Sequence, residues 1–484
     1  MRPLLLCILT LFLITACSVG PNYKPPNVKI PSHYKEAPSG RKFADPQDIC
    51  DRGKWWQVFN DPLLNELEER VNISNQNIKV AIAQYDQATA LLVQTRSAFY
   101  PMVSGSGSVT REKQAVTTTA ISALSSSGST SVNASKGAFT DYNVSLNASW
   151  IPDIWGSVRR AVEANVAGVQ ASAAQVAATR LLMQSSLAQY YFELRGLDGD
   201  QKVFNDTVKN YQRLLEITLN QYRAGTVSRA NVLQVKSLLE LAQVQAIDNG
   251  ILRAQYEHAI AVLVGLPPAN MTILPEVYIA KVPSIPVEMP SMLLERRPDI
   301  AQAERLVAEA SAEIGVAIAA YFPVLTLTGA NGYNSTSLSR LFTEPAHFWS
   351  LGAQLADTLF DGGLRRGKVD QACAVLKQTV AQYRQTVLTA FQNVEDNLVA
   401  LRVLDTEIAK QNEAVKTSRE ALSVVLNEYK AGTLALSDVL NAEITLYTAQ
   451  KGANDIAYRQ MTAAVNLITA LGGGWDVAKL PEKI

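Results

Sequence analysis

The chain has 484 residues, with 44 basic and 44 acidic side chains and therefore a formal net charge of zero. This balance gives no basic excess for nucleic-acid binding and no acidic tail, so we predict no nucleic-acid partner. Hydrophobic residues make up 48% of the chain but aromatic residues only 7%, a composition that favours long helices over a compact aromatic-rich core.

The N-terminus predicts a lipoprotein signal peptide over residues 1–16. Arg2 precedes an apolar run, Leu4 to Ile14, which is shorter than the roughly 20 residues of a bilayer-spanning helix. The run ends in Ile14-Thr-Ala-Cys17, the pattern of a bacterial lipobox, in which the cysteine sulfur receives a diacylglyceryl group. We therefore expect Cys17 to be the lipid anchor, with an N-acyl diacylglyceryl modification. Ser18 in place of Asp favours sorting to the outer membrane.

The residue types that carry catalysis or metal binding are scarce. Cys50 and Cys373 remain in the mature chain, and a disulfide between them and two free thiols both stay open, because sequence separation does not determine geometry. No spacing of Cys and His indicates zinc. His33, His258 and His347 stand in unrelated contexts, and there is no Gly-rich phosphate loop. We predict that the protein is not an enzyme and binds no cofactor besides the lipid.

The sequence contains an internal duplication. Tyr222-Arg-Ala-Gly225-Thr226-Val227 recurs 207 residues later as Tyr429-Lys-Ala-Gly432-Thr433-Leu434. Tyr100-Pro101 and Phe322-Pro323 are 222 residues apart, because the first copy carries additional residues between its proline and its glycine. These fall in Ala115 to Ser135, a low-complexity segment that we interpret as an exposed loop. The repeats predicted from these matches cover residues 62–264 and 298–471.

In each repeat a β-hairpin follows the initial helical segment, at about 101–150 and about 323–358. Between Tyr142 and Trp150, apolar residues alternate strictly with Asn and Ser, which predicts a strand with one apolar and one polar face. Four strands per chain, each of about 9–11 residues, have the length that crosses a membrane when tilted. A small soluble sheet is the alternative. The Asn/Ser face, which suits a water-filled lumen, and the lipobox favour the membrane.

A long helical hairpin follows each pair of strands, at 156–264 and 362–471. The first arm of each lacks Pro, and a straight helix of that length would reach roughly 100 Å. Apolar residues near the turns step by three and four, the spacing of a coiled coil. Four membrane strands cannot close a barrel alone, so several copies must share one. A monomer is therefore excluded, whereas assemblies of two, three or four copies all remain open.

The sequence resembles the TolC-type outer-membrane efflux proteins, specifically the lipidated branch that works with resistance–nodulation–division pumps. The resemblance covers nearly the whole mature chain. It rests on the paired Tyr-x-x-Gly-Thr turns and on these motifs: Gly20-Pro21-Asn22-Tyr23 shortly after Cys17, Trp55-Trp56-Gln-Val-Phe59, Glu295-Arg-Arg-Pro-Asp299-Ile-Ala-Gln-Ala-Glu304 and Phe360-Asp-Gly-Gly363.

The resemblance implies an α+β membrane protein that forms a trimeric duct. A shared 12-stranded β-barrel, with four strands per chain, would lie in the outer membrane, and an α-helical barrel of coiled-coil hairpins would cross the periplasm. Residues 17–61 (the acylated segment), the linker 265–297 and the tail 472–484 would form a mixed equatorial domain. The implied partners are two further copies, a periplasmic adaptor protein, an inner-membrane pump and outer-membrane lipid. The implied function is export of drugs or other small toxic compounds.

The resemblance also implies site residues. Asp438 and Asn441 match the positions of a periplasmic gate, and three copies of Asp438 would form a cation-favouring ring. A helix-start role for Asp438 is the alternative. The two turns would contact the adaptor, or they are structural turns alone; their residues are Tyr222, Gly225, Thr226, Tyr429, Gly432 and Thr433. Four arginines below the barrel either tune the lumen charge or are simply solvated, and we favour solvation; they are Arg159, Arg160, Arg365 and Arg366.

Two other functions remain open on the sequence. The same duct architecture would serve type I protein secretion. Only the pump encoded by the neighbouring genes would distinguish secretion from efflux. A structural tether that spans the envelope without transport is the other alternative. A conductance measurement would distinguish a tether from a channel.

Overall fold

The computed structural model describes residues 19–36, 52–113, 138–277, 282–283, 285 and 290–481. Cys17, Cys50 and the predicted loop from Ala115 to Ser135 lie outside these residues. The chain divides into two compact units. Unit 1 comprises Met1–Lys24, Ala90–Val166 and Ala308–Leu376, and unit 2 comprises Pro25–Thr89, Ala167–Val307 and Lys377–Ile484. Each unit takes residues from both repeats, so the units do not coincide with the duplication.

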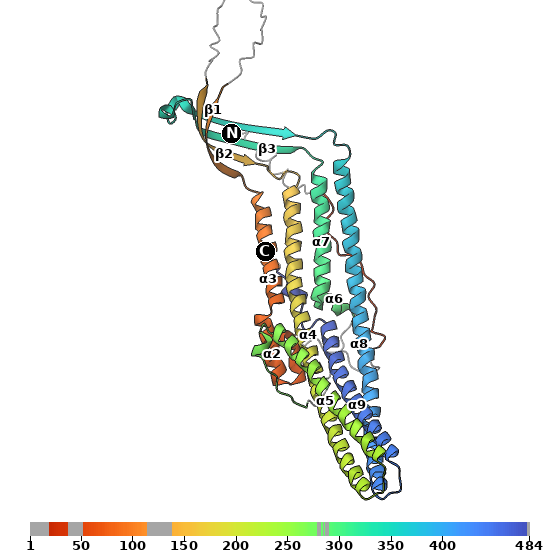
Figure 1. The fold of residues 1–484 in the computed structure, drawn as a ribbon. Helices are drawn as coiled ribbons and strands as arrows, with labels where there is room; N and C mark the ends of the chain where they lie inside the picture. Colours follow the sequence, from red (N-terminus) through yellow and green to blue (C-terminus); the bar gives the residue numbers. More distant parts are fainter. Residues whose placement is uncertain are drawn as a thin grey trace, which may run out of the picture. The chain divides into compact units, whose positions relative to one another are not determined.

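The described chain combines long helices with one small sheet (Figure 1). The strands are β1 (Met102–Glu112), β2 (Phe139–Trp150), β3 (Val324–Ser335) and β4 (His347–Ala356). The α-helices are α2 (Pro62–Ser74), α3 (Gln76–Ser97), α4 (Ser157–Arg223), α5 (Arg229–Leu263), α6 (Leu293–Arg296), α7 (Pro298–Ala319), α8 (Leu364–Lys430) and α9 (Leu436–Ala470). Short 3₁₀ helices lie at Arg52–Phe59, Pro268–Asn270, Pro290–Met292, Leu338–Arg340, Glu344–Ala346 and Val477–Lys479.

The helix lengths confirm the duplication. Helices α4 and α8 each have 67 residues, and α5 and α9 each have 35, with starting points 207 residues apart in both cases. Helices α3 and α7 each have 22 residues and start 222 residues apart. The long, proline-free first arms predicted from the sequence are therefore present in both copies. Within the described residues, no helix is both long enough and apolar enough to cross a bilayer.

The sheet lies in unit 1 and is antiparallel throughout, in the order β1-β2-β3-β4. Each repeat supplies one hairpin, and β2 pairs with β3 to join the two, for example with Leu146 opposite Asn331. Successive residues point to opposite faces, so the register places Leu146 and Trp349 on the same face. Strands β1 and β4 form the edges of the sheet, and neither has a second strand beside it in the described chain.

In unit 2, the ends of the four long helices near the turns pack around a shared apolar core (Figure 1). Several of the coiled-coil positions predicted from the sequence lie in this core. Val235, Leu239 and Ala242 are buried on α5, and Val439 and Leu446 are buried on α9. The core therefore includes residues of both repeats, and neither helical hairpin buries its apolar face alone.

Two glycines in α4 mark a close approach of helices in unit 2. A Cβ at Gly196 would lie 2.6 Å from Tyr458 Cδ1 on α9, and one at Gly199 would collide with the side chain of Asn454. The Asn454 amide donates to the Gly196 carbonyl at 2.7 Å and to Asp200 at 2.8 Å. These glycines do not interrupt α4. Because they have no side chain, they leave room for Tyr458 and Asn454 of α9.

Candidate functional site

The turns that join the long helices have the same backbone geometry in both repeats. Gly225 and Gly432 have φ angles of +75° and +80°, a region that glycine occupies without a steric penalty. The Gly225 N–H donates to the Tyr222 carbonyl at 2.9 Å, and the Thr226 N–H donates to the carbonyl five residues earlier at 3.0 Å. Gly432 and Thr433 repeat both hydrogen bonds. This pattern is the Schellman ending of a helix, so the repeated motif acts as a helix cap.

The two turn tyrosines differ in exposure although they are equivalent in the repeats. Tyr222 is 44% exposed, whereas Tyr429 is 3% exposed and packs in the shared core with Val439. The Tyr429 hydroxyl is buried and has no hydrogen-bond partner in the described part of the chain. The assignment of Tyr429 to adaptor contact is therefore corrected, because a partner cannot reach a side chain that the core covers. Thr226 and Thr433 are exposed.

Asp438 lies in the first turn of α9 and is exposed. Its carboxylate accepts a hydrogen bond from the Ala435 N–H at 3.2 Å, which confirms the helix-start role. Asn441, one turn further along the helix, is also exposed. The neighbours Val439 and Leu440 are buried, so the apolar face fixes the rotation of α9 and leaves both polar side chains free to face solvent.

Glu443 is a buried carboxylate near the gate positions that sequence reasoning missed. It is 5% exposed on α9 and accepts a hydrogen bond from the Asn210 amide of α4 at 3.2 Å. Burial raises the pKa of Glu443 above its usual value, and the Asn210 hydrogen bond partly opposes this shift. The signal was present in the sequence: Glu443 lies four residues after Val439 and three before Leu446, at a core position of the coiled coil.

A charged network in unit 2 was also missed. Asp198 of α4 is buried and pairs with Arg195 of the same helix at 3.1 Å and with Arg253 of α5 at 2.7 Å. Both arginines also donate to carbonyls of the linker that follows α5, at Ile273 and Leu274. The network therefore ties two helices to the linker. In the described ranges, no group of three His, Cys, Asp or Glu side chains could hold a metal ion.

The strand-to-helix junctions in unit 1 use Asp–Arg pairs. Arg159 pairs with Asp153 at 3.2 Å, and Arg365 pairs with Asp361 at 2.7 Å. The Arg365 guanidinium and backbone N–H groups lower the pKa of Asp361. Both aspartates also accept backbone N–H groups at the start of the following helix. The prediction of simple solvation is thus wrong for these arginines, which position the first turns of α4 and α8.

The second arginine of each Arg-Arg sequence, Arg160 or Arg366, has a different environment in the two repeats. The Arg160 side chain is 5% exposed, whereas that of Arg366 is 85% exposed. Arg366 lies 3.9 Å from Asp370, a distance typical of a weak surface pair. Solvation therefore describes Arg366 but is wrong for Arg160.

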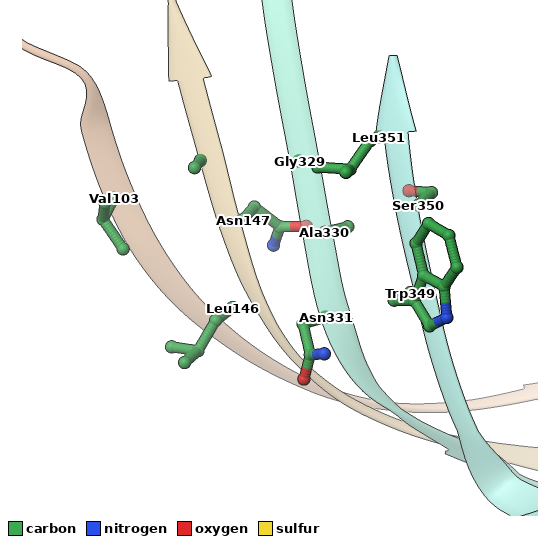
Figure 2. A pocket seen from close by; sticks show the side chains of 10 residues that line it. Val103, Leu146, Asn147, Gly329, Ala330, Asn331, Trp349, Ser350 and Leu351 are labelled. Atoms are coloured by element: carbon green, nitrogen blue, oxygen red, sulfur yellow. The ribbon is translucent and has the colours of Figure 1, made fainter. Parts of the chain in front are cut away.

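The predicted alternation of the sheet is confirmed. A hollow of about 430 Å³ is lined by side chains that include Val103, Leu146, Trp349 and Leu351, from three of the strands. Figure 2 shows these side chains. These side chains share one face and are 61–80% exposed. Side chains on the other face hydrogen-bond to one another, as in the Ser106–Ser145 contact at 3.0 Å. An uncovered apolar face opposite a hydrogen-bonded polar face is the pattern of a strand between lipid and water.

The chain was compared with known families and proteins. Residues 68–266 and 289–473 match the family described as "Outer membrane efflux protein". The chain is 28% identical over 476 residues to the probable efflux pump outer membrane protein TtgC of Pseudomonas putida, covering 98% of this chain and 96% of that protein. It is 29% identical over 470 residues to the pyoverdine export outer membrane protein OpmQ of Pseudomonas aeruginosa, covering 96% and 95%.

The fold is shared with solved channels. The CmeC outer membrane channel of Campylobacter jejuni superposes with a TM-score of 0.86 at 23% identity, over 96% of each chain. The family match covers well over half of the sequence and includes both repeats. The chain therefore belongs to the outer membrane efflux protein family, whose members work at the outer membrane.

Proposed function

We propose that the protein is the outer-membrane channel of a tripartite efflux system and that three copies share one barrel. The observation that supports this most is the four-stranded sheet with open edges at β1 and β4. Unpaired backbone groups are not tolerated in hydrocarbon, so a membrane sheet must close on itself. About eight strands are the practical minimum for a closed barrel, so other copies must supply the remaining strands.

Exposed apolar residues on α5 support the association of copies. Helix α5 presents large apolar side chains to solvent along its length, whereas its equivalent α9 presents Ile444. Exposed apolar patches of this extent on a helix mark protein interfaces. In the proposed assembly, α5 of one copy packs against a neighbouring copy, which explains why the duplicated helices differ. The residues are Leu233, Leu241, Val244, Ile247, Ile251, Leu252 and Val262.

We assign the anchor to Cys17 and the periplasmic gate to Asp438 and Asn441. The lipobox supports the first, and the exposure of both side chains at the start of α9 supports the second. The adaptor would contact the exposed parts of the turns, at Tyr222, Gly225, Thr226, Gly432 and Thr433. The inner-membrane pump would supply the energy and select the small toxic compounds that are exported.

Deleting the gene tests the proposed export function. We expect a susceptibility increase of about fourfold or more to at least one class of toxic compound, and restoration by the wild-type gene. A strain with Cys17→Ala should regain part of the resistance, because the membrane strands still provide attachment. Unchanged susceptibility to every compound class would contradict the efflux function.

Conductance in planar bilayers tests the gate. Asp438→Asn removes the charge but keeps an oxygen that accepts the Ala435 N–H, so the start of α9 should stay intact. We expect the ratio of cation to anion permeability to fall about twofold or more. Asn231→Ala changes the equivalent position of the first repeat and should leave the ratio unchanged. An equal ratio in wild type and Asp438→Asn would remove Asp438 from the gate.

A further inference from the structure

The described chain begins with a short strap, Val19 to Asn22, that Arg160 holds against unit 1. Arg160 Nε donates to the Val19 carbonyl at 3.1 Å. Its Nη2 donates to the Gly20 carbonyl at 3.2 Å and to Asn22 Oδ1 at 2.9 Å, and its Nη1 donates to Glu163 at 2.7 Å. The strap thus receives three hydrogen bonds from one charged side chain that is itself buried.

The strap lies at the junction between the sheet and the helices of unit 1. The Val19 N–H donates to the carbonyl of Trp155, between β2 and α4, at 3.3 Å. The Trp155 indole donates to the Pro323 carbonyl at 2.8 Å and stacks on Phe322 at 4.8 Å. Residues 322–323 connect α7 to β3, so the strap is attached where the strand-to-helix connection of the first repeat meets the helix-to-strand connection of the second.

Two glycines let the strap approach this closely. Gly20 has a φ of +96°, and a Cβ there would lie 2.6 Å from Gly315 Cα on α7. A Cβ at Gly315 would lie 2.7 Å from Arg160 Cγ. The strap, α7 and the Arg160 side chain therefore fill one space, and a methyl group at either glycine would displace part of it. We call Arg160, Gly20 and Gly315 the strap lock.

The duplication shows that the lock is not a general feature of the junction. At the 207-residue offset of the helix starts, Gly367 stands at the position of Arg160, and the neighbouring Arg366 is exposed. Within the described residues, the first repeat alone therefore has an arginine, Arg160, whose guanidinium donates to the strap carbonyls. Lys could not replace it fully, because an ammonium group lacks the planar fork of five donors.

We propose that the strap lock fixes the point at which the acylated N-terminus leaves the protein, and that Arg160 is a positioning residue for the lipid anchor. This inference rests on the proposed acylation of Cys17. Cys17 is two residues before Val19 in the sequence, and two residues of chain span at most about 7 Å whatever their conformation. The lock thereby directs the acyl chains into the bilayer beside the strand-to-helix junction. Without it, the lipid would be tethered by a free strap and would guide insertion poorly.

Hydrogen exchange of the strap tests the lock itself. In Arg160→Ala, amide exchange of a peptide containing Val19 to Tyr23 should accelerate about tenfold or more, because three charge-assisted hydrogen bonds are lost. Arg160→Lys should give an intermediate rate. Arg366→Ala is the matched control and should leave strap exchange unchanged. Equal strap exchange in wild type and Arg160→Ala would overturn the lock.

A double-mutant cycle tests the positioning of the lipid. The quantity measured is the fraction of protein assembled in the outer membrane, with Arg160→Ala placed in the lipidated protein and in a Cys17→Ala form exported by an ordinary cleavable signal. We expect about a fivefold loss in the lipidated protein and less than about a twofold further loss in the unlipidated one. Equal losses in both would show that Arg160 acts on folding alone and would overturn the positioning role.

Mass spectrometry of the N-terminal peptide separates the two proposals. An acylated Cys17 together with equal losses in the cycle overturns the positioning role and leaves the anchor intact. An unmodified Cys17 overturns the anchor and with it the positioning role, while the exchange experiment still decides whether Arg160 holds the strap. Wild-type strap exchange in Gly315→Ala would contradict the close packing of the lock.

Discussion

Asp198→Asn tests whether the buried charged network holds the linker after α5. Asp198 is 2% exposed and is shared by the Arg195 and Arg253 side chains, which are 3% and 17% exposed. The same carboxylate accepts the backbone N–H of Glu276 at 3.1 Å. Arg253 keeps a second carboxylate partner, Glu257 at 2.8 Å. The other carboxylate partner of Arg195, Glu276, lies 3.5 Å away and is 72% exposed. Replacing Asp198 by a neutral amide therefore leaves the buried Arg195 guanidinium with little compensation of its charge.

Asp198→Asn should strongly lower the stability of the linker, and the equivalent substitution in the second repeat serves as a control. Removing one partner of a buried ion pair costs about 3–5 kcal/mol. Asp405 occupies the equivalent position in the second repeat, but it is exposed and pairs with the neutral amide of Gln460 at 2.9 Å. Asp405→Asn should therefore cost at most about 1 kcal/mol, the usual contribution of one hydrogen bond. The two substitutions are chemically identical, and the two sites differ in the burial of the carboxylate and in the charge of its partners.

Native-state hydrogen exchange is the assay, because the Glu276 amide reports on the linker directly. A loss of 3 kcal/mol corresponds to exchange that is about 100-fold faster, since each 1.4 kcal/mol is a factor of ten. We expect this acceleration in Asp198→Asn and less than about a tenfold change in Asp405→Asn. Similar effects of the two substitutions, or unchanged exchange at Glu276, would refute the idea that buried charge pairing holds the linker.

Three further substitutions address single buried or strained groups. Glu68 is fully buried without a hydrogen-bond partner among the described residues, and burial raises its pKa. Glu68→Gln should therefore stabilise the protein increasingly above about pH 4.5, by up to about 1.4 kcal/mol per pH unit. Tyr429→Phe removes a buried hydroxyl without a partner and should change stability by less than about 1 kcal/mol. Gly432→Ala places a side chain at a φ of +80° and should cost about 1–2 kcal/mol, whereas Gly250→Ala within α5 should not destabilise.

The sign of the Glu68 effect follows from its raised pKa. Between the ordinary pKa and the raised one, the folded chain keeps a proton that the unfolded chain has released, so stability falls as pH rises. Unfolding of wild type and Glu68→Gln, measured from pH 4 to 8, should therefore diverge with pH. Parallel pH profiles would show that Glu68 has a partner. A clear loss of stability in Tyr429→Phe would show that the Tyr429 hydroxyl has a hydrogen-bond partner. An unchanged stability in Gly432→Ala would contradict the prediction that the backbone at residue 432 is strained by a side chain.

Features with a strong local pattern were predictable from the sequence. The fixed distance between the repeated turns gave helices of equal length, and strict alternation from Tyr142 to Trp150 gave the two faces of the sheet. The equal helix lengths follow from the duplication, whereas the alternation follows from the two-residue period of a strand. The glycines within α4 do not interrupt this helix, because packing of α9 against Gly196 outweighs the low helix propensity of glycine.

Features that depend on distant partners were not predictable. Arg160 and Arg366 stand in similar local sequences, yet only the first meets the strap, which comes from about 140 residues earlier in the chain. Tyr222 and Tyr429 share a motif, but the shared core covers only Tyr429. A duplicated sequence predicts equivalent backbones, whereas the environment of each side chain depends on what the other segments place beside it.

Cross-linking of the sheet edges tests most directly the claim that several copies complete one barrel. Cysteines would replace Val103 in β1 and, one at a time, the β4 residues on the same face, such as Leu351, in a chain with Cys50→Ser and Cys373→Ser. We expect disulfides between copies, with bands of two and three chains and none larger. Disulfides confined to single chains, for every pair of positions, would contradict it.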